Sequence, residues 1–205
     1  MSKFGLSQPV RRVEDSRFLT GHGRYVDDIA PAGALHAVFV RSPVAHATIA
    51  TIDVAAAKAA PGVRLVLTGA DLAETTTNDI DGGRIKNRDG SMSVRPKRPA
   101  LATGRVRHVG EAVALVVAES LAEAKDAAEL VEVDYDALDA VTDGAAALAG
   151  EGPQLHEEAD GNLCYDWGIG DEDATEAALA SAAHTVELSL VNNRAVANPM
   201  EPRGA

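Results

Sequence analysis

The chain has 205 residues, of which 46% are hydrophobic and only 3% aromatic, and its formal net charge at pH 7 is −12. This length and apolar content suffice for one good core, or one core and a smaller attached piece, built from aliphatic residues. The strong negative charge repels a phosphate backbone, which argues against nucleic acid as a partner.

The first half of the chain is predicted to contain three strands and one helix. Apolar residues follow the strand period, and both faces of the first strand are largely apolar, as in a buried strand. The strands are expected at 34–40, 47–52 and 64–67. Asp53 is the expected N-cap of a short Ala-rich helix over 54–60. A loop-like arm, residues 1–33, precedes these elements, and a long polar connection, residues 73–105, follows them.

The clearest unit begins with the unbroken apolar run 112–118, which is typical of a strand covered on both faces. Ser120 and Glu123 form a capping box that predicts a helix to about residue 130. Apolar and acidic residues then alternate over 131–136, which indicates a strand with one buried and one wet face. The order is strand–helix–strand, as it is in the first half.

The last third is predicted to begin with a linker, residues 144–170, rich in Gly, Ala and acids. Asp173 and Glu176 repeat the capping pattern for a helix over 174–183, and alternating residues predict a final strand at 186–190. Together these elements indicate an α+β or α/β domain over roughly 20–142. The last forty residues are interpreted as the opening of another domain.

Charge is distributed unevenly along the chain. Residues 151–176 carry nine acids and no Lys or Arg, whereas the loop from 84 to 98 carries six bases against the single acid Asp89. The bases of this loop are Arg84, Lys86, Arg88, Arg95, Lys97 and Arg98. Such a loop is either a solvated surface or a docking loop for an acidic neighbour, and the sequence leaves both open.

Cysteine usage and hydropathy indicate where the protein resides. Cys164 is the only cysteine, so the chain can form no internal disulfide and cannot by itself hold a structural zinc or an iron–sulfur cluster. The first residues contain no apolar signal region, and no apolar run approaches the roughly 20 residues of a membrane helix. We expect a soluble, cytoplasmic protein without a membrane span.

No strong catalytic pattern is found in the sequence. The turn at 21–23 (Gly-His-Gly) lacks the third glycine and the preceding strand of a dinucleotide fingerprint, so a tight turn is the favoured interpretation. The acids Glu132, Asp134 and Asp136 are attributed to solvation, and acids surround Cys164, which argues against a reactive thiolate. The histidines are expected to be structural or exposed: His22, His36, His46, His108, His156 and His184. We therefore assign no catalytic residue and no metal ligand, and the cofactor-binding residues are unknown.

Two short segments are possible sites. Residues 108–111 (His-Val-Gly-Glu) lie directly before the apolar strand 112–118, where functional loops gather. The alternative, a turn in which the Glu111 side chain binds adjacent backbone, is slightly favoured. Residues 200–204 (Met-Glu-Pro-Arg-Gly) place a Glu and an Arg between two prolines, and either a structural clamp or a cofactor-side loop is possible.

Several segments together resemble one family. They lie at 17–29 (RFLTGHGRYVDDI), 40–47 (VRSPVAHA), 61–72, 107–114 (RHVGEAVA), 129–135 (ELVEVDY) and 192–205. Six motifs in this order resemble the molybdopterin-binding large subunits of the xanthine dehydrogenase/aldehyde oxidase family, in the branch of aerobic carbon monoxide dehydrogenase. Val44 stands where the family commonly has His.

This resemblance implies an α/β hammerhead-type domain over residues 1–145, including an N-terminal extended arm, and the first elements of the molybdopterin-binding domain over 146–205. It implies an oxidoreductase that hydroxylates an electron-poor carbon, or oxidises carbon monoxide, with water as the oxygen source. FAD and [2Fe-2S] clusters are expected on medium and small partner subunits of a hetero-oligomer. The family's cofactor contacts and glutamate base match no residue here, so this segment alone is expected to bind no cofactor and to be inactive.

The alternative is a non-enzymatic hammerhead-like assembly module that docks on a partner subunit. For a part of a hydroxylase subunit, the 84–98 loop is a candidate contact. The apolar strand expected near Val186–Val191 is predicted to expose an edge that favours association.

Overall fold

The computed structural model describes residues 11–74, 83–193, 195–199 and 201. The chain divides into two compact units, one formed by Leu35–Thr185 and the other by the terminal segments Met1–Ala34 and Val186–Ala205. The start of the chain lies outside the described residues. The clamp or cofactor-side loop predicted at 200–204 also lies outside them, except for Glu201.

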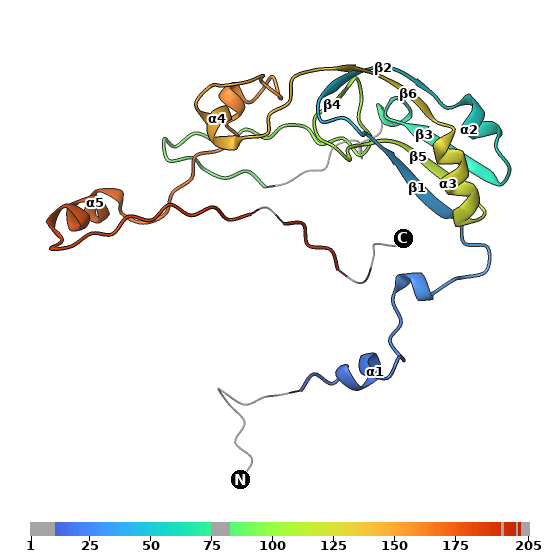
Figure 1. The fold of residues 1–205 in the computed structure, drawn as a ribbon, viewed down its shortest axis with the longest axis horizontal. Helices are drawn as coiled ribbons and strands as arrows, with labels where there is room; N and C mark the ends of the chain where they lie inside the picture. Colours follow the sequence, from blue (N-terminus) through green and yellow to red (C-terminus); the bar gives the residue numbers. More distant parts are fainter. Residues whose placement is uncertain (1–10, 75–82, 194, 200, 202–205) are drawn as a thin grey trace, which may run out of the picture. The chain divides into compact units, whose positions relative to one another are not determined.

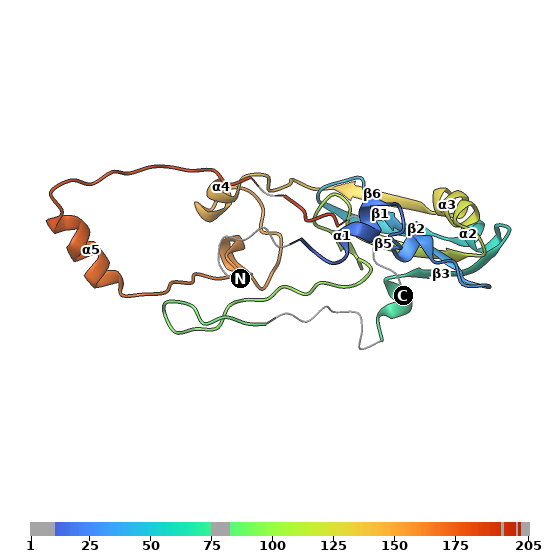
Figure 2. The same cartoon turned by 90° about the horizontal axis from the view of Figure 1, so that it is seen from below.

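The larger unit contains two three-stranded sheets in which all pairs are antiparallel (Figures 1 and 2). The first sheet has the order β1-β5-β3 and consists of β1 (His36–Arg41), β5 (Ala112–Ala118) and β3 (Val63–Thr68). The second has the order β4-β2-β6 and consists of β4 (Arg105–Val106), β2 (Ala47–Asp53) and β6 (Glu132–Ala137). The predicted α+β class is confirmed, with helices beside antiparallel sheets.

Both strand–helix–strand units connect one sheet to the other. Helix α2 (Ala55–Ala59) follows β2 of the second sheet and leads to β3 of the first. Helix α3 (Leu121–Glu129) follows β5 of the first sheet and leads to β6 of the second. Only nine residues separate β2 from β3, and a parallel crossover within one sheet needs a dozen or more.

Strand β5 lies at the centre of the core, as its unbroken apolar run predicted. Val113 and Val116, which have opposite parity along the strand, are both fully buried. Val116 packs in a cluster with Ala57 of α2 and Ala127 of α3, whereas Val113 belongs to the cluster that includes Ala47 of β2. The two faces of this one strand therefore join the helical layer to the second sheet.

Strand β1 differs from its prediction. Both of its faces were expected to be buried, yet Phe39 is 46% exposed. The reason is its position, because β1 is an edge strand of its sheet, whereas β5 is the central one. The alternation in β6 is confirmed, since its acids lie on the exposed face and Val133 and Tyr135 on the partly buried one.

The caps explain where the helices begin. Ser120 accepts a hydrogen bond from the Glu123 amide at 3.2 Å, so it is confirmed as the N-cap of α3. The second bond of the predicted capping box differs, because the Glu123 carboxylate accepts from the Ser120 hydroxyl and not from its backbone amide. The N-cap of α2 is Val54 and not the predicted Asp53, which lies one residue earlier, although the Asp53 carboxylate accepts from the amide of Ala55, the first residue of the helix. The prediction for α5 (Glu172–Ser181) was wrong, because its cap is Asp171 rather than Asp173. The helix begins earlier than expected, and Asp173 lies in its first turn.

The predicted linker at 144–170 contains ordered structure. Asp143 caps α4 (Gly144–Leu148) through bonds to two amides of its first turn. A 3-10 turn, η3 (Asp160–Asn162), follows and contacts α4. Asn162 fixes the turn, because its side chain accepts from the Leu155 amide and donates to the Pro153 carbonyl.

The terminal unit contains little regular structure among its described residues. It holds the short helix α1 (Asp15–Leu19) and the 3-10 turn η1 (Val26–Asp28) within the predicted loop-like arm. The strand predicted at 186–190 is not formed, and Val186 is 94% and Leu190 80% exposed. A strand needs a hydrogen-bonding partner, and no described residue pairs with this segment.

Candidate functional site

The basic loop and the acid-rich segment of the chain bind each other. Residues 86–92 form a small hairpin closed by a bridge between Lys86 and Met92. The Arg88 amide donates to the Asp166 carbonyl at 2.9 Å, and the Val94 amide donates to the Cys164 carbonyl at 2.8 Å. Backbone pairing thus lays residues 164–166 along the loop.

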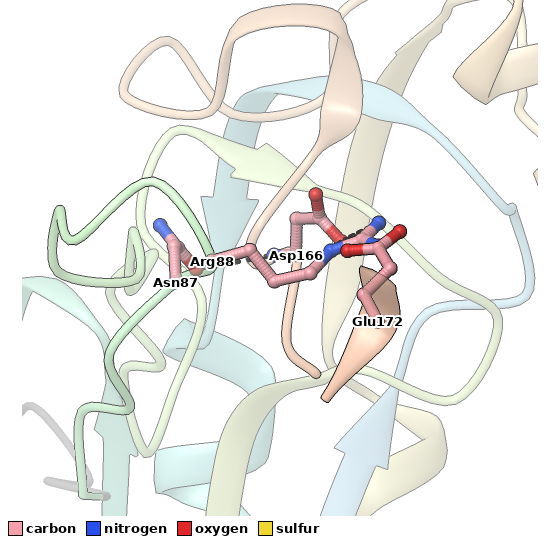
Figure 3. Close-up of polar contacts among 4 residues, drawn as sticks. All are labelled: Asn87, Arg88, Asp166 and Glu172. Carbon is pink, nitrogen blue, oxygen red and sulfur yellow. Dashed lines mark hydrogen bonds and ion pairs between the residues drawn. The ribbon is translucent and has the colours of Figure 1, made fainter. Parts of the chain in front are cut away.

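Arg88 is the central side chain of this contact (Figure 3). Its Nη2 and Nε lie 2.8 and 3.0 Å from Oδ1 of Asp166, and its Nη1 lies 3.2 Å from Oε1 of Glu172 on α5. The Asp166 amide in turn donates to the Asn87 side chain at 3.1 Å. The hydrogen bond and the charge of Asp166, followed by the charge of Glu172, raise the pKa of Arg88 above its ordinary value.

Gly168 explains how the segment passes so close to the arginine. A Cβ at this position would lie 2.9 Å from Cδ of Arg88. The site is therefore a clamp of one arginine between two carboxylates, beside a cavity of about 830 Å³. Because both carboxylates neutralise Arg88, the clamp is suited to holding chain segments together and not to binding an anion.

This arrangement answers part of the docking-loop hypothesis. An acidic neighbour of the loop lies within the chain itself, in the segment of nine acids and no bases. The sequence shows both charge runs but does not show that they contact each other. Their complementary composition was the signal, although no local rule identifies Asp166 and Glu172 as the residues that meet Arg88, which lies 78 and 84 positions away in the sequence.

The turn before β5 has the structural role that the sequence slightly favoured. Glu111 is mostly buried, and its Oε2 accepts a 2.5 Å hydrogen bond from the Arg107 amide. Gly110 has φ +87°, a left-handed conformation that glycine adopts readily. Its amide donates to the Ser42 carbonyl, and its own carbonyl accepts from Arg41 at 2.8 Å. The turn therefore ties β1 to β5.

The other candidate residues have structural surroundings. In the terminal unit, Gly21 has φ +75°, and a Cβ on Gly23 would lie 2.7 Å from the Phe18 ring, so the tight turn is confirmed. On β6, Asp134 accepts from Thr51 at 2.7 Å on the exposed face, in agreement with solvation. Within the described ranges, no three His, Cys, Asp or Glu side chains gather as a metal site.

His46 is the one described histidine that is almost fully buried, at 4% exposure. Its Nδ1 lies 2.6 Å from the Asp139 carbonyl, so Nδ1 must carry the proton and donate it. Its Nε2 has no hydrogen-bond partner among the described residues. The histidine therefore fixes the end of β6 against β2, as a structural residue does.

The clamp does not form a cradle for a molybdenum cofactor. An anionic, phosphate-bearing pterin requires grouped donors and positive charge, but the clamp cavity is lined by Asp89, Asp171, Glu172 and Glu176 against two bases. We therefore assign no described residue to cofactor binding at the clamp. No described helix is long and apolar enough to cross a membrane.

Comparison with known proteins identifies the fold. The family model for the aldehyde oxidase and xanthine dehydrogenase a/b hammerhead domain matches residues 20–139, more than half of the chain. The nicotine 6-hydroxylase large subunit of Paenarthrobacter nicotinovorans is 41% identical over 199 residues, which are 97% of this chain and 24% of that subunit. The carbon monoxide dehydrogenase large chain of Afipia carboxidovorans is 36% identical over 211 residues, 96% of this chain and 25% of that one.

The match to solved structures agrees. Quinoline 2-oxidoreductase from Pseudomonas putida 86 superposes with a TM-score of 0.61 and 49% identity over 70% of this chain and 18% of that one. The chain spans about a quarter of the length of the curated relatives that it matches. The resemblance drawn from the six motifs is confirmed: the chain belongs to the aldehyde oxidase and xanthine dehydrogenase family of molybdenum hydroxylases, as part of a large subunit, and residues 20–139 are its hammerhead domain.

Proposed function

We propose that the chain is the N-terminal part of the large subunit of a molybdenum hydroxylase and that it is inactive alone. The observation that carries the proposal is the two-sheet hammerhead unit, in a chain 41% identical to a nicotine 6-hydroxylase large subunit over 97% of its own length. The complete subunit would hold molybdopterin, which supplies the oxidation of an electron-poor carbon, or of carbon monoxide, with water as the oxygen source.

The partners follow from the same proposal. The large subunit would transfer its electrons to [2Fe-2S] clusters and FAD on a small and a medium subunit in a cytoplasmic hetero-oligomer. The lone Cys164 agrees with this for the present segment alone, because one thiolate cannot hold an iron–sulfur cluster. Nitrogen heteroaromatics are the first substrates to assay, because nicotine 6-hydroxylase and quinoline 2-oxidoreductase share 41% and 49% identity with this chain, against 36% for carbon monoxide dehydrogenase.

Within the subunit, residues 1–145 would form the hammerhead domain with its arm, and 146–205 would begin the molybdopterin-binding domain. Exposed apolar side chains support this boundary. Trp167 and Tyr165 are 55% and 59% exposed, and α5 buries none of its residues. Such surface is usually covered by a partner. The remainder of the subunit would cover it and would supply the missing strand partner for 186–190.

The first experiment measures the intact mass and the molybdenum content of the same native preparation. A chain several times heavier than 21.2 kDa that contains about one molybdenum per large chain supports the proposal. A dye-reduction assay on that preparation then compares nicotine, quinoline, an aldehyde, xanthine and carbon monoxide. A stable product of 21.2 kDa without molybdenum would refute the proposal and favour the assembly module.

A further inference from the structure

A second cavity, of about 510 Å³, lies beside the turn that precedes β5. Its walls come from the end of β1, the end of the long connection, the turn itself and the segment after α4. The ionisable residues that line it are Arg41, Lys97, Arg98, Arg107, His108, Glu111 and His156. Among the described lining residues, Arg41, Lys97 and Arg107 thus face the carboxylate of Glu111, in a chain whose net charge is −12.

Two of the arginines donate their hydrogen bonds to neutral groups in the described part of the chain. Arg41 donates through Nη1 to the Gly110 carbonyl at 2.8 Å, and Arg107 donates through Nε to the Leu155 carbonyl, also at 2.8 Å. These bonds fix the two side chains. The charge of Arg107 also acts on Glu158 beside the cleft, whose carboxylate accepts from the Lys97 amide at 3.3 Å. A guanidinium has five N–H donors, so most of the donors of each arginine remain for a ligand.

The one carboxylate of the cleft is already engaged. Glu111 accepts from the Arg107 amide, and its Oε2 lies 3.6 Å from Nδ1 of His108. Because its side chain is only 13% exposed and holds the turn, Glu111 is not free to move to the arginines. Even with Glu158 beside it, the cleft keeps more cations than acids, because Arg41, Lys97 and Arg107 face Glu111 and Glu158.

The positive charge of the cleft affects the pKa of His156. Burial lowers its pKa below the ordinary 6.5, and the charge of Arg107 lowers it further, with a smaller effect of the same sign from Arg98. Glu158 and Glu111 act in the opposite direction without offsetting these effects. The charges of Arg107 and Arg98 thus make a proton on this imidazole less favourable than burial alone does.

We propose that this cleft binds an oxyanion, a phosphate or carboxylate group, held by Arg41, Lys97 and Arg107. The planar guanidinium fork matches the spacing of oxyanion oxygens, and the cleft is large enough for a small organic anion. The proposal does not depend on the hydroxylase function, because all of its residues lie within the larger compact unit.

The test titrates the 205-residue chain with sodium phosphate and, separately, with sodium acetate at constant ionic strength, while NMR follows the ring of His156. We expect a saturable shift and a higher pKa of His156 in the presence of the anion, because bound negative charge stabilises the imidazolium. Saturation by phosphate indicates a phosphate ligand, and saturation by acetate alone indicates a carboxylate ligand. Absence of saturation with both anions overturns the proposal.

Two double variants distinguish anion binding in the cleft from a general effect of lost positive charge. Arg41→Gln with Lys97→Gln should weaken anion binding about tenfold, since each exposed ion pair contributes only modestly. Lys58→Gln with Lys125→Gln removes the same charge outside the cleft and should leave the affinity unchanged. Equal loss in both double variants would mean a diffuse ion atmosphere and would overturn the site. The single Lys97→Gln variant, at an exposed side chain, serves if the first pair does not fold.

Discussion

Gly69 provides the sharpest test of the packing in the larger unit. It follows β3 at the start of the 3-10 turn η2 (Ala70–Leu72) with φ −58° and ψ −30°, a conformation open to any residue. A Cβ at this position would lie 2.5 Å from the Ala102 carbonyl oxygen and 2.9 Å from that of Leu101. Both contacts are with backbone, so no rotamer change relieves them.

The expected effect of Gly69→Ala follows from two opposing terms. Overpacking against a fixed backbone costs about 1–3 kcal/mol, whereas loss of glycine's freedom in the unfolded chain returns about 0.4–1 kcal/mol. The net loss of about 1–2 kcal/mol lowers Tm by roughly 3–8 °C in a domain of this size. Circular dichroism during thermal unfolding measures this shift.

Gly83→Ala is the matched control. Gly83 has no atom of a described residue within 4 Å of its Cβ position and no positive φ, so this substitution should leave Tm unchanged or raise it slightly. If Gly69→Ala were as stable as the control, the close approach of residues 101–102 to β3 would be refuted.

Three further predictions concern the core, the histidine and the clamp. Val116→Ala changes a fully buried side chain of β5 and should lower the free energy of unfolding in urea by about 2 kcal/mol, because it removes two methyl groups and leaves a cavity. A loss below about 0.5 kcal/mol would contradict the burial of both faces of this strand. Stability should fall as pH drops below 6.5, because the unfolded chain then binds a proton that native His156, with its lowered pKa, does not bind. His156→Asn should flatten this part of the pH profile, and an unchanged slope would exclude His156 as its source. Arg88→Gln should speed amide hydrogen exchange at 164–172 without lowering the overall Tm, whereas Arg84→Gln in the same loop should not, and equal exchange in the two variants would argue against the clamp.

The elements that sequence predicted best are those whose local and tertiary preferences agree. The run 112–118 and the Ser120–Glu123 box predicted β5 and α3 nearly to the residue, because the strand is buried on both faces and the helix carries its own cap. The strand predicted at 186–190 was wrong because its local pattern has no matching tertiary contact. Its alternating apolar residues predict a strand with one buried face, and no described part of the chain provides the partner that would bury that face.

The candidate site shows the same limit. Glu111 could be assigned from sequence because its partner, the Arg107 amide, lies four residues away. The Arg88 contacts could not, because they depend on how the two sheets place the 84–98 loop against a distant segment. The opposite charges of the two segments indicate that they attract each other, but only the fold shows which residues pair.

The basic loop therefore divides into two parts with different electrostatic surroundings. Arg88 is neutralised by Asp166 and Glu172, whereas Lys97 lines a cleft with Arg41 and Arg107. Neutralising Lys86, Arg88, Lys97 and Arg98 together would loosen an internal contact and remove an anion site at once. A loss of subunit assembly in that variant would then have two causes. Only separate changes at Arg88 and at Lys97 distinguish a partner that needs the ordered acidic segment from one that binds the cleft directly.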